Sequence, residues 1–181
     1  EIADIILNLV ELFRYSTKGY EFVTLGEEIE IVNKYIDILQ MRYRNRFEVH
    51  IKVPEELLNR RILRMTLQPI VENAFFHGLE RIVSGGRISI QALKTGEKAF
   101  CITIEDNGAG IPPQAMGELQ AMLQGGEQQM IKEVTLKDLR GIGLANIQAR
   151  IRLKYGTGFG LRIESQQGTG TRVILLLPFI Q

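Results

Sequence analysis

Four short segments of this chain combine glycines with side chains that can bind a polar ligand or a metal ion. They are Glu72-Asn73 with His77 after them, the run from Asp106 to Ile111, the run from Gly141 to Asn146, and the run from Gly168 to Thr171. Residues four positions apart share one face of a helix, so Asn73 and His77 are expected to point the same way. These segments could form one site if the fold brings them together.

Each segment offers a different kind of contact. Glycines that open a helix let backbone N–H groups approach an anion, so Gly141 to Asn146 is a candidate phosphate cradle. Asp106 has the wrong sign for phosphate, but its carboxylate can accept a hydrogen bond from an exocyclic amine such as that of adenine. Asn73 supplies an uncharged oxygen, which suits Mg²⁺ beside phosphate oxygens. Together the segments predict a nucleotide site.

Each segment taken alone also has an ordinary structural explanation. The tripeptide Asp106-Asn107-Gly108 is a common turn sequence. The two glycines at 141 and 143 can be a tight entry into a helix, and Asn73 can be a satisfied core residue or a cap. The prediction therefore depends on the order of the whole set and not on any single member.

The hydrophobic pattern predicts the elements that must hold these segments. Helices are expected over 2–15, from Thr24 through Tyr43, over 66–77, from Pro112-Pro113 to about Leu123, and over 142–155. Strands are expected over 47–53, 87–93, 99–105, 161–165 and 171–177. Thr24 and Glu27 form a capping box, Gly78 ends the third helix, and residues 125–137 are a polar loop. Helices that alternate with mostly hairpin-joined strands predict an α+β fold, a two-layer sandwich.

The composition fits one globular domain with an appendage. Of 181 residues, 45% are hydrophobic and 24% are charged, and 22 basic against 21 acidic residues give a net charge of +1. The sequence has no basic stripe, so nucleic acid is not an expected partner.

The single cysteine, Cys101, lies in an apolar run and is expected in the core, in a reducing compartment. No apolar stretch approaches the roughly 20 residues of a membrane span, and the chain opens at Glu1 within a helical pattern, so we expect a fragment of a longer protein.

Three strings carry a resemblance to a known family: Leu67-Gln68-Pro69-Ile70-Val71-Glu72-Asn73-Ala74, Asp106-Asn107-Gly108-Ala109-Gly110-Ile111, and Gly141-Ile142-Gly143-Leu144-Ala145-Asn146-Ile147. They resemble the N, G1 and G2 boxes of the GHKL ATPase and kinase superfamily, and more narrowly those of the LytS/YesM-like sensor histidine kinases. The resemblance also includes Phe13-Arg14-Tyr15-Ser16 and the tail from Tyr155 to Thr171, and so covers essentially the whole chain. It implies a Bergerat-type α/β sandwich with a mixed sheet, preceded by a helical segment.

The resemblance implies ATP and Mg²⁺ as cofactors. In the family the G1 aspartate, here Asp106, hydrogen-bonds the adenine amine, and the N-box asparagine, here Asn73, binds the Mg²⁺ that bridges the phosphates. Residues 113–140 would be an ATP lid, and Thr171 would lie near the adenine, with a water between them. The residues assigned to ATP are Asn73, His77, Asp106, Gly108, Gly110, Ile111, Lys137, Arg140, Gly141, Gly143, Leu144, Asn146 and Thr171. For His77 a cap on the helix carbonyls is the alternative.

Two positions depart from the wider superfamily pattern. Phe76 stands where many histidine kinases carry a lysine, which removes one cation from the phosphates. Pro69 stands where ATP-hydrolysing members place a catalytic glutamate, and proline cannot act as a base. Vigorous hydrolysis of ATP is therefore not expected. Glu72 points about 100° away from Asn73 around the helix, and we assign it a supporting or orienting role in catalysis.

The acceptor histidine of this family lies on a helix that would precede residue 1, and neither His50 nor His77 has its surrounding motif. Residues 1–20 would be the end of the dimerisation and phosphoacceptor region, and residues 21–181 the catalytic ATP-binding domain. The implied partners are the protein's own phosphoacceptor helix, a response regulator and a second subunit of a homodimer. The domain would be cytoplasmic and its parent anchored in the bacterial membrane. Three alternatives stay open: a GHKL ATPase, a Ser/Thr kinase of the anti-sigma type, and a nucleotide-binding module without transfer.

Overall fold

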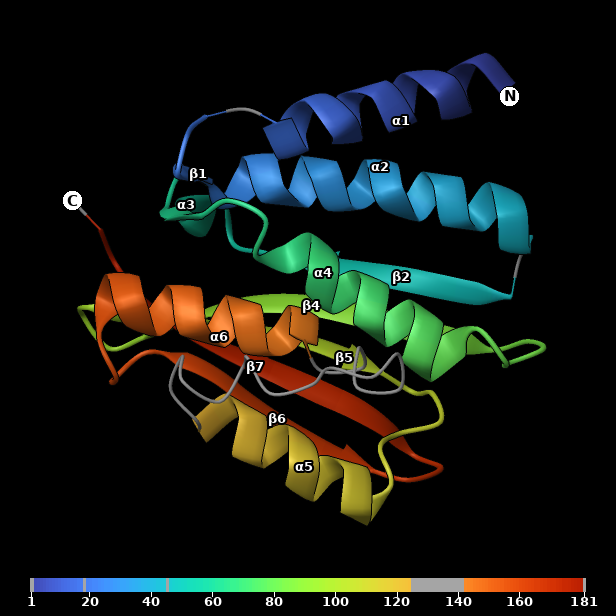
Figure 1. The fold of residues 1–181 in the computed structure, drawn as a ribbon. Coiled ribbons are helices and arrows are strands. Elements are labelled where there is room, and N and C mark those ends of the chain that lie inside the picture. Colours follow the sequence, from blue (N-terminus) through green and yellow to red (C-terminus); the bar gives the residue numbers. More distant parts are fainter. Residues whose placement is uncertain (1, 18, 45, 125–141, 181) are drawn as a thin grey trace.

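The computed structural model describes residues 2–17, 19–44, 46–124 and 142–180 (Figure 1). The elements in chain order are α1 (Ile2–Thr17), β1 (Phe22–Thr24), α2 (Leu25–Tyr43), β2 (Phe47–Lys52), α3 (Glu55–Leu58), β3 (Arg61–Leu63), α4 (Leu67–Asn73), η1 (Ala74–Leu79), β4 (Gly86–Thr95), β5 (Ala99–Asp106), α5 (Pro113–Gln124), α6 (Ile142–Tyr155), β6 (Gly160–Gln166) and β7 (Gly170–Pro178). Every predicted helix and strand is present, the third helix as α4 followed by the π-helix η1.

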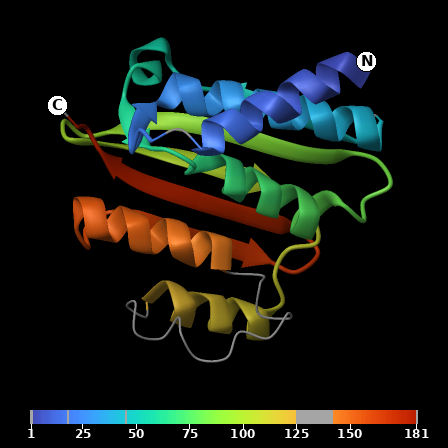
Figure 2. The same cartoon turned by 45° about the horizontal axis from the view of Figure 1, so that its top comes forward.

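A five-stranded sheet forms one layer of the domain. Its strand order is β2-β4-β5-β7-β6, with β2 parallel to β4 and the other neighbours antiparallel. The helices α2, α4 and α6 cover one face, while α1 lies outside α2 and α5 lies beside α6 (Figures 1 and 2). This arrangement confirms the predicted two-layer sandwich with a mixed sheet.

The pleat of β5 decides which side chains face the helices. Phe100, Ile102 and Ile104 are buried under the helical layer, and Asp106 continues the same inward series. Cys101 lies between two of these residues, so it faces the other side of the sheet and is only half-buried. The prediction of Cys101 as a core side chain is therefore wrong. The run of apolar residues was continuous, but the two-residue period of a strand sends alternate members to opposite faces.

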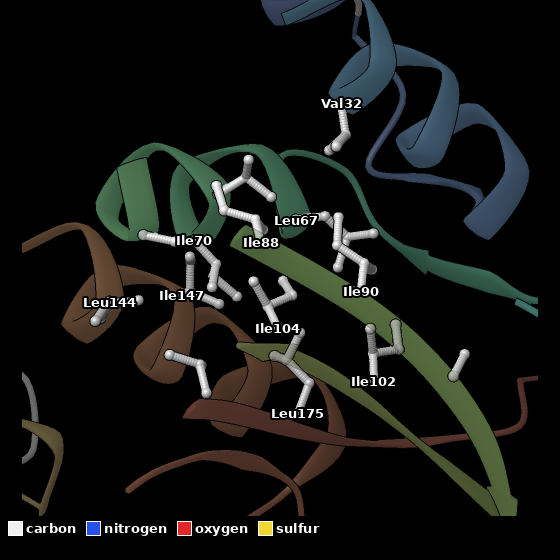
Figure 3. Packing of buried hydrophobic residues seen from close by; sticks show 14 of the residues in the cluster. Val32, Leu67, Ile70, Ile88, Ile90, Ile102, Ile104, Leu144, Ile147 and Leu175 are labelled. Atoms are coloured by element: carbon white, nitrogen blue, oxygen red, sulfur yellow. The ribbon is translucent and has the colours of Figure 1, made fainter. Parts of the chain in front are cut away.

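The hydrophobic core lies between the sheet and the helices (Figure 3). Its members from three helices and three strands include Val32, Leu67, Ile70, Leu144, Ile147, Ile88, Ile90, Ile102, Ile104 and Leu175. Burying one such side chain contributes about 2 kcal/mol. Because α4 and α6 are both attached to the sheet in this way, the core also fixes the segments that they carry at their ends.

The start of α2 follows the predicted capping box. The Thr24 hydroxyl Oγ1 accepts a hydrogen bond from the Glu27 N–H at 3.1 Å, and the Glu27 carboxylate Oε2 accepts one from the Thr24 N–H at 2.7 Å. Ile29, Val32, Ile36 and Leu39 from the predicted stripe are buried in the core. This helix is therefore attached along its length to the sandwich.

The helix that begins at Leu67 does not end at Gly78. It changes to π-helical geometry at Ala74 and continues to Leu79, with the Glu80 N–H bonded to the Phe75 carbonyl at 2.8 Å. Gly78 lies inside the helix and does not cap it; its backbone instead contacts another segment of the chain. Its buried backbone carbonyl accepts a hydrogen bond from the Ala109 N–H at 3.0 Å.

Three short elements were not predicted. β1 and β3 form a separate antiparallel pair, with Val23 opposite Ile62, and α3 is a single turn. Strands of three residues are too short to show a period of two, so their pairing has no local signal. Within the described ranges, no helix is both long and apolar enough to cross a membrane.

Candidate nucleotide-binding site

Asp106 is the last residue of β5 and its carboxyl group is buried, with the residue only 5% exposed. Oδ1 accepts a hydrogen bond from the Gly108 N–H at 2.8 Å, and the backbone of Thr171 supplies a second bond to the carboxyl group. The next strand, β7, pairs Thr171 directly with Asp106. The carboxylate is thus held rigidly by two backbone groups.

Burial raises the pKa of Asp106 to about 6, and the nearby charge of Glu105 adds to the effect. The hydrogen bonds from Gly108 and Thr171 act in the opposite direction, because they stabilise the charged form. A carboxylate with a raised pKa and free lone pairs can accept another donor. The amine of a purine is such a donor.

Glycines surround Asp106 because the backbone segments touch. A Cβ on Gly78 would lie 2.5 Å from Asp106 Oδ1, one on Gly108 would lie 2.3 Å from the Gly78 carbonyl, and one on Gly170 would lie 2.0 Å from the Asp106 carbonyl oxygen. Gly110 has φ +64° and is similarly close to Gln166. Gly108 and Gly110 were predicted to make room for an adenine. The contacts of both glycines are with the chain itself, and their role toward a base stays a prediction.

Asn73 lies at the end of α4, half-buried, with its amide oriented by the helix. Its Nδ2 donates to the Pro69 carbonyl at 2.7 Å, which leaves Oδ1 as the atom that can meet a cation. A Cβ on Gly143 would lie 3.5 Å from Nδ2, so the N box and the start of α6 are in contact. Among the described residues there is no cluster of three or more His, Cys, Asp or Glu side chains that could hold a metal ion. The residues fit a metal held by Asn73 together with phosphate oxygens and water, which is how Mg²⁺ is commonly bound.

The first turn of α6 lies next to Asn73. The helix begins at Ile142, so the N–H groups of Gly143 and Leu144 belong to its first turn, where anions are favoured. The Leu144 side chain is buried in the core (Figure 3), whereas Asn146 is exposed. The predicted contacts of Lys137, Arg140 and Gly141, and most of the predicted lid, lie outside the described residues.

The other predicted residues of the N-box helix are placed as follows. Glu72 accepts a hydrogen bond from Gln68 Nε2 at 3.0 Å, one turn earlier in the helix. His77 is exposed on η1, and Phe76 beside it is 42% exposed, with its ring edge-on to Phe75. Pro69 occupies the first helical turn, as predicted.

Ser165 on β6 is a residue of this region that was not predicted as part of the site. Its hydroxyl Oγ accepts from the Ile111 N–H at 2.8 Å and donates to the Gly170 carbonyl at 2.9 Å. It also lies 2.9 Å from Thr171 Oγ1. Ser165 therefore ties the loop after Asp106 to the Gly168–Thr171 run. A serine within an alternating strand carries no signal for this role.

A hollow lies at the open face of the sheet, over β2, β4 and the end of β5. It is lined by His50, Arg87, Ser89, Gln91, Glu105, Asp106, Asn107 and Thr169. His50 and Ser89 pair across β2 and β4 and face this side, and Arg172 bridges Glu105 and Glu164 on the same face. Of the residues predicted to bind the nucleotide, the hollow includes Asp106 and none of the phosphate-binding candidates.

The two-layer sandwich, with Asp106 buried at a strand end and Asn73 beside the first turn of α6, agrees with the fold expected for the GHKL type. Residues 59–181 match the family described as "Histidine kinase-, DNA gyrase B-, and HSP90-like ATPase", and residues 1–47 match the family described as "Histidine kinase". The chain belongs to the first of these families, and its N-terminal part matches the second.

Two curated relatives illustrate the match. The chain is 31% identical over 180 residues to sensor histidine kinase BtsS of Escherichia coli strain K12. This match covers 99% of this chain and 28% of the relative. It is 35% identical over 158 residues to sensor histidine kinase YesM of Bacillus subtilis strain 168, which covers 87% of this chain and 24% of the relative. The chain thus spans about a quarter of the length of these relatives.

Solved structures agree with the fold. The mycobacterial sensor histidine kinase MprB aligns with a TM-score of 0.54 and 22% identity, over 88% of this chain and 97% of that one. The catalytic domain of histidine kinase ThkA aligns with a TM-score of 0.59 and 14% identity, over 90% and 97% of the two chains. At this identity the likeness concerns the fold alone.

Proposed function

We propose that this chain is the ATP-binding catalytic part of a sensor histidine kinase that transfers the γ-phosphoryl group of ATP to a histidine outside residues 1–181. The observation that carries the proposal is that the N-box helix and its continuation contact both groups: Gly78 packs against the buried carboxylate of Asp106, and the Asn73 amide lies beside Gly143 in the first turn of α6. The relatives named sensor histidine kinases support the same reading.

The proposed roles follow from the chemistry of each group. Asp106 accepts a hydrogen bond from the adenine amine, and Thr171 contacts the base through water. Asn73 Oδ1 binds a Mg²⁺ ion, which neutralises charge on the phosphates when it is present. The N–H groups at the start of α6 hold the phosphates. Lys137, Arg140 and Gly141 complete the phosphate contacts, and His77, Ile111 and Asn146 line the nucleotide.

The transfer step needs positioning more than covalent chemistry by the protein. A lone pair of the acceptor imidazole forms the bond to the γ-phosphorus, the bond from that phosphorus to the bridging oxygen breaks, and ADP leaves. Glu72 has a supporting role, since it is turned toward Gln68. Pro69 provides no base for water, so ATP hydrolysis by the chain alone is expected to be slow.

The partners are proposed from the same reading. The acceptor is a helix of the parent protein that packs near α1, the parent is a membrane-anchored homodimer, and the phosphoryl group passes to an aspartate of a response regulator. His50 is not the acceptor in this proposal, because it lies on β2 and pairs with Glu48 at 3.4 Å on the open face of the sheet.

Calorimetric titration with a non-hydrolysable ATP analogue, with and without Mg²⁺, tests the nucleotide site. Asn73→Ala is expected to abolish the extra affinity that Mg²⁺ provides while it keeps metal-free binding. Asp106→Asn is expected to lower affinity roughly 100-fold under both conditions, because an amide presents a donor and loses the charged acceptor.

Phosphoryl transfer is tested separately, by mixing the chain with radiolabelled ATP and the parent's helical region that carries its histidine. Label on that histidine supports the proposal. Binding without transfer would favour a nucleotide-binding module, and fast release of inorganic phosphate by the chain alone would favour a GHKL ATPase.

A further inference from the structure

Glu28 of α2 is a buried carboxylate outside the nucleotide site, with the residue 1% exposed. Its oxygens accept hydrogen bonds from the backbone N–H groups of Met65 at 2.7 Å, Thr66 at 3.0 Å and Leu67 at 2.8 Å. The Tyr15 hydroxyl of α1 donates a fourth bond to the same carboxylate. One side chain therefore binds two other segments of the chain at a single point.

The three N–H groups belong to the start of the helix that carries Asn73. Thr66 precedes α4 but does not cap it, since its hydroxyl donates to the Leu63 carbonyl at 2.6 Å. Glu28 takes the place of the cap, and a negative charge is favourable at this end of a helix. The position of α4 is thus set by a residue of α2.

The junction before α4 is also strained. Met65 has φ +57°, which places it in the left-handed region that residues with a side chain rarely adopt. This conformation costs about 1 kcal/mol for a residue with a side chain. The bond from the Met65 N–H to Glu28 helps to hold it.

Helix α1 reaches this junction through Tyr15. The Tyr15 hydroxyl donates to Glu28, and the Tyr15 backbone carbonyl accepts a hydrogen bond from Arg64 Nη1. The Arg64 guanidinium also lies 5.7 Å from the centre of the Tyr15 ring. Tyr15, Val23 and Ile31 form a small buried cluster apart from the main core, with Leu12 and Met65 packed against it. The inner end of α1 is therefore attached to the residues that begin α4.

Helix α6 reaches the same junction from the other side. Arg150 donates to the Met65 carbonyl at 3.2 Å and to the Arg64 carbonyl at 2.5 Å. The first turn of α6 holds Gly143, which contacts Asn73. Both helices of the nucleotide site are therefore bonded to the segment that Glu28 and Tyr15 hold.

From these contacts we infer that Glu28 is a positioning residue for Asn73, and that the Tyr15 hydroxyl makes this positioning depend on helix α1. The inference rests on the proposed function for the role of Asn73 as the metal ligand. A movement of α1 that breaks the Tyr15–Glu28 bond shifts α4 and lowers affinity for the metal-bound nucleotide. Asp106 lies on β5, where the backbone of Gly108 and Thr171 holds its carboxylate, so the adenine contact is expected to change less than the metal contact.

The variant Tyr15→Phe removes only the hydroxyl, and Tyr35→Phe is its matched control. Tyr35 lies on α2 and its buried hydroxyl has no hydrogen-bond partner in the described part of the chain. Affinity for a non-hydrolysable ATP analogue is measured with and without Mg²⁺. Tyr15→Phe is expected to reduce the affinity in Mg²⁺ roughly fivefold, with little change in its absence, while Tyr35→Phe changes neither.

A second measurement does not depend on nucleotide. The side-chain amide resonances of Asn73 are expected to shift in Tyr15→Phe and to stay in place in Tyr35→Phe. An equal loss of affinity with and without Mg²⁺, or unchanged Asn73 resonances, would overturn the inference. If the unaltered chain shows no effect of Mg²⁺, the proposed function fails, and the Asn73 resonances alone then decide whether Tyr15 positions this residue.

Discussion

Glu28 and Asp106 are both buried carboxylates, but the chain surrounds them differently. Glu28 accepts hydrogen bonds from three backbone N–H groups and one tyrosine hydroxyl. Asp106 has the backbone bonds of Gly108 and Thr171, and desolvation raises its pKa to about 6. A carboxylate has about four lone-pair sites. Those of Glu28 are used by the protein, whereas Asp106 keeps acceptor capacity.

This difference separates a structural carboxylate from one that can bind a ligand. Burying a charge is costly unless hydrogen bonds compensate it. Around Glu28 the compensation comes from the fold, so this residue holds the fold together. Around Asp106 the compensation is incomplete without a ligand, so this residue can bind one. Substitutions at the two positions are expected to affect different properties.

The largest expected effect is on stability at Glu28. Glu28→Gln replaces an acceptor oxygen by an NH₂ group that faces N–H donors, and it should lower the free energy of unfolding by about 3 kcal/mol. Asp106→Asn should cost less than about 1 kcal/mol, because removal of a desolvated charge offsets a weakened hydrogen bond. Urea denaturation of both variants at pH 8 measures the difference. Equal losses would remove the distinction between the two carboxylates.

The next effect concerns the tight packing around Asp106. Gly108→Ala places a methyl group against the Gly78 backbone, at 2.3 Å from its carbonyl, and should destabilise the domain by about 2 kcal/mol while it weakens nucleotide binding. Gly117→Ala is the control, since Gly117 lies within α5 with open space around it and should stabilise by about 0.5–1 kcal/mol. Thermal unfolding and nucleotide titration check both. If Gly108→Ala leaves the free energy of unfolding unchanged, the loop at Gly108 can move away from the Gly78 backbone at little cost.

The smallest effect is the pH dependence of nucleotide affinity. The folded-state pKa of Asp106 is raised to about 6, so its charged acceptor form is present above pH 6 and is lost below it. Affinity is expected to be flat above pH 7 and to fall by at most about tenfold per pH unit below 6. The contribution of Asp106 to the free energy of unfolding should instead increase as the pH falls through 6, because the folded state binds this proton more tightly than the unfolded state does. The variant Asp106→Asn has no carboxyl group to titrate at this position, so its pH profile shows the part that comes from the nucleotide phosphates. If its affinity has the same pH profile as that of the unaltered chain, Asp106 is not the group that controls binding.

The features that were predicted correctly depend on contacts close in sequence. The capping box at Thr24 spans four residues, and the start of α6 at Ile142 was predicted from Gly141 and Gly143, which flank it in the sequence. The five strands of the sheet were also predicted, because their apolar runs and the turns that bound them are local features. In contrast, the open-face position of Cys101, the π-helix and the role of Ser165 depend on pairing and packing with distant segments.

The amino-acid sequence by itself determined the longer elements and the family, and it predicts a set of residues that would meet a nucleotide, because turn, cap and glycine preferences act over a few residues. Only the tertiary structure decided what each carboxylate does. Glu28 and the Leu67 N–H that it binds are 39 positions apart, and no local pattern marks that pair. The raised pKa of Asp106 likewise comes from its burial, which exists only after the segments of Gly78, Gly108 and Gly170 have closed around it. Desolvation is a property of the assembled fold, and so the difference between the two carboxylates appears only there.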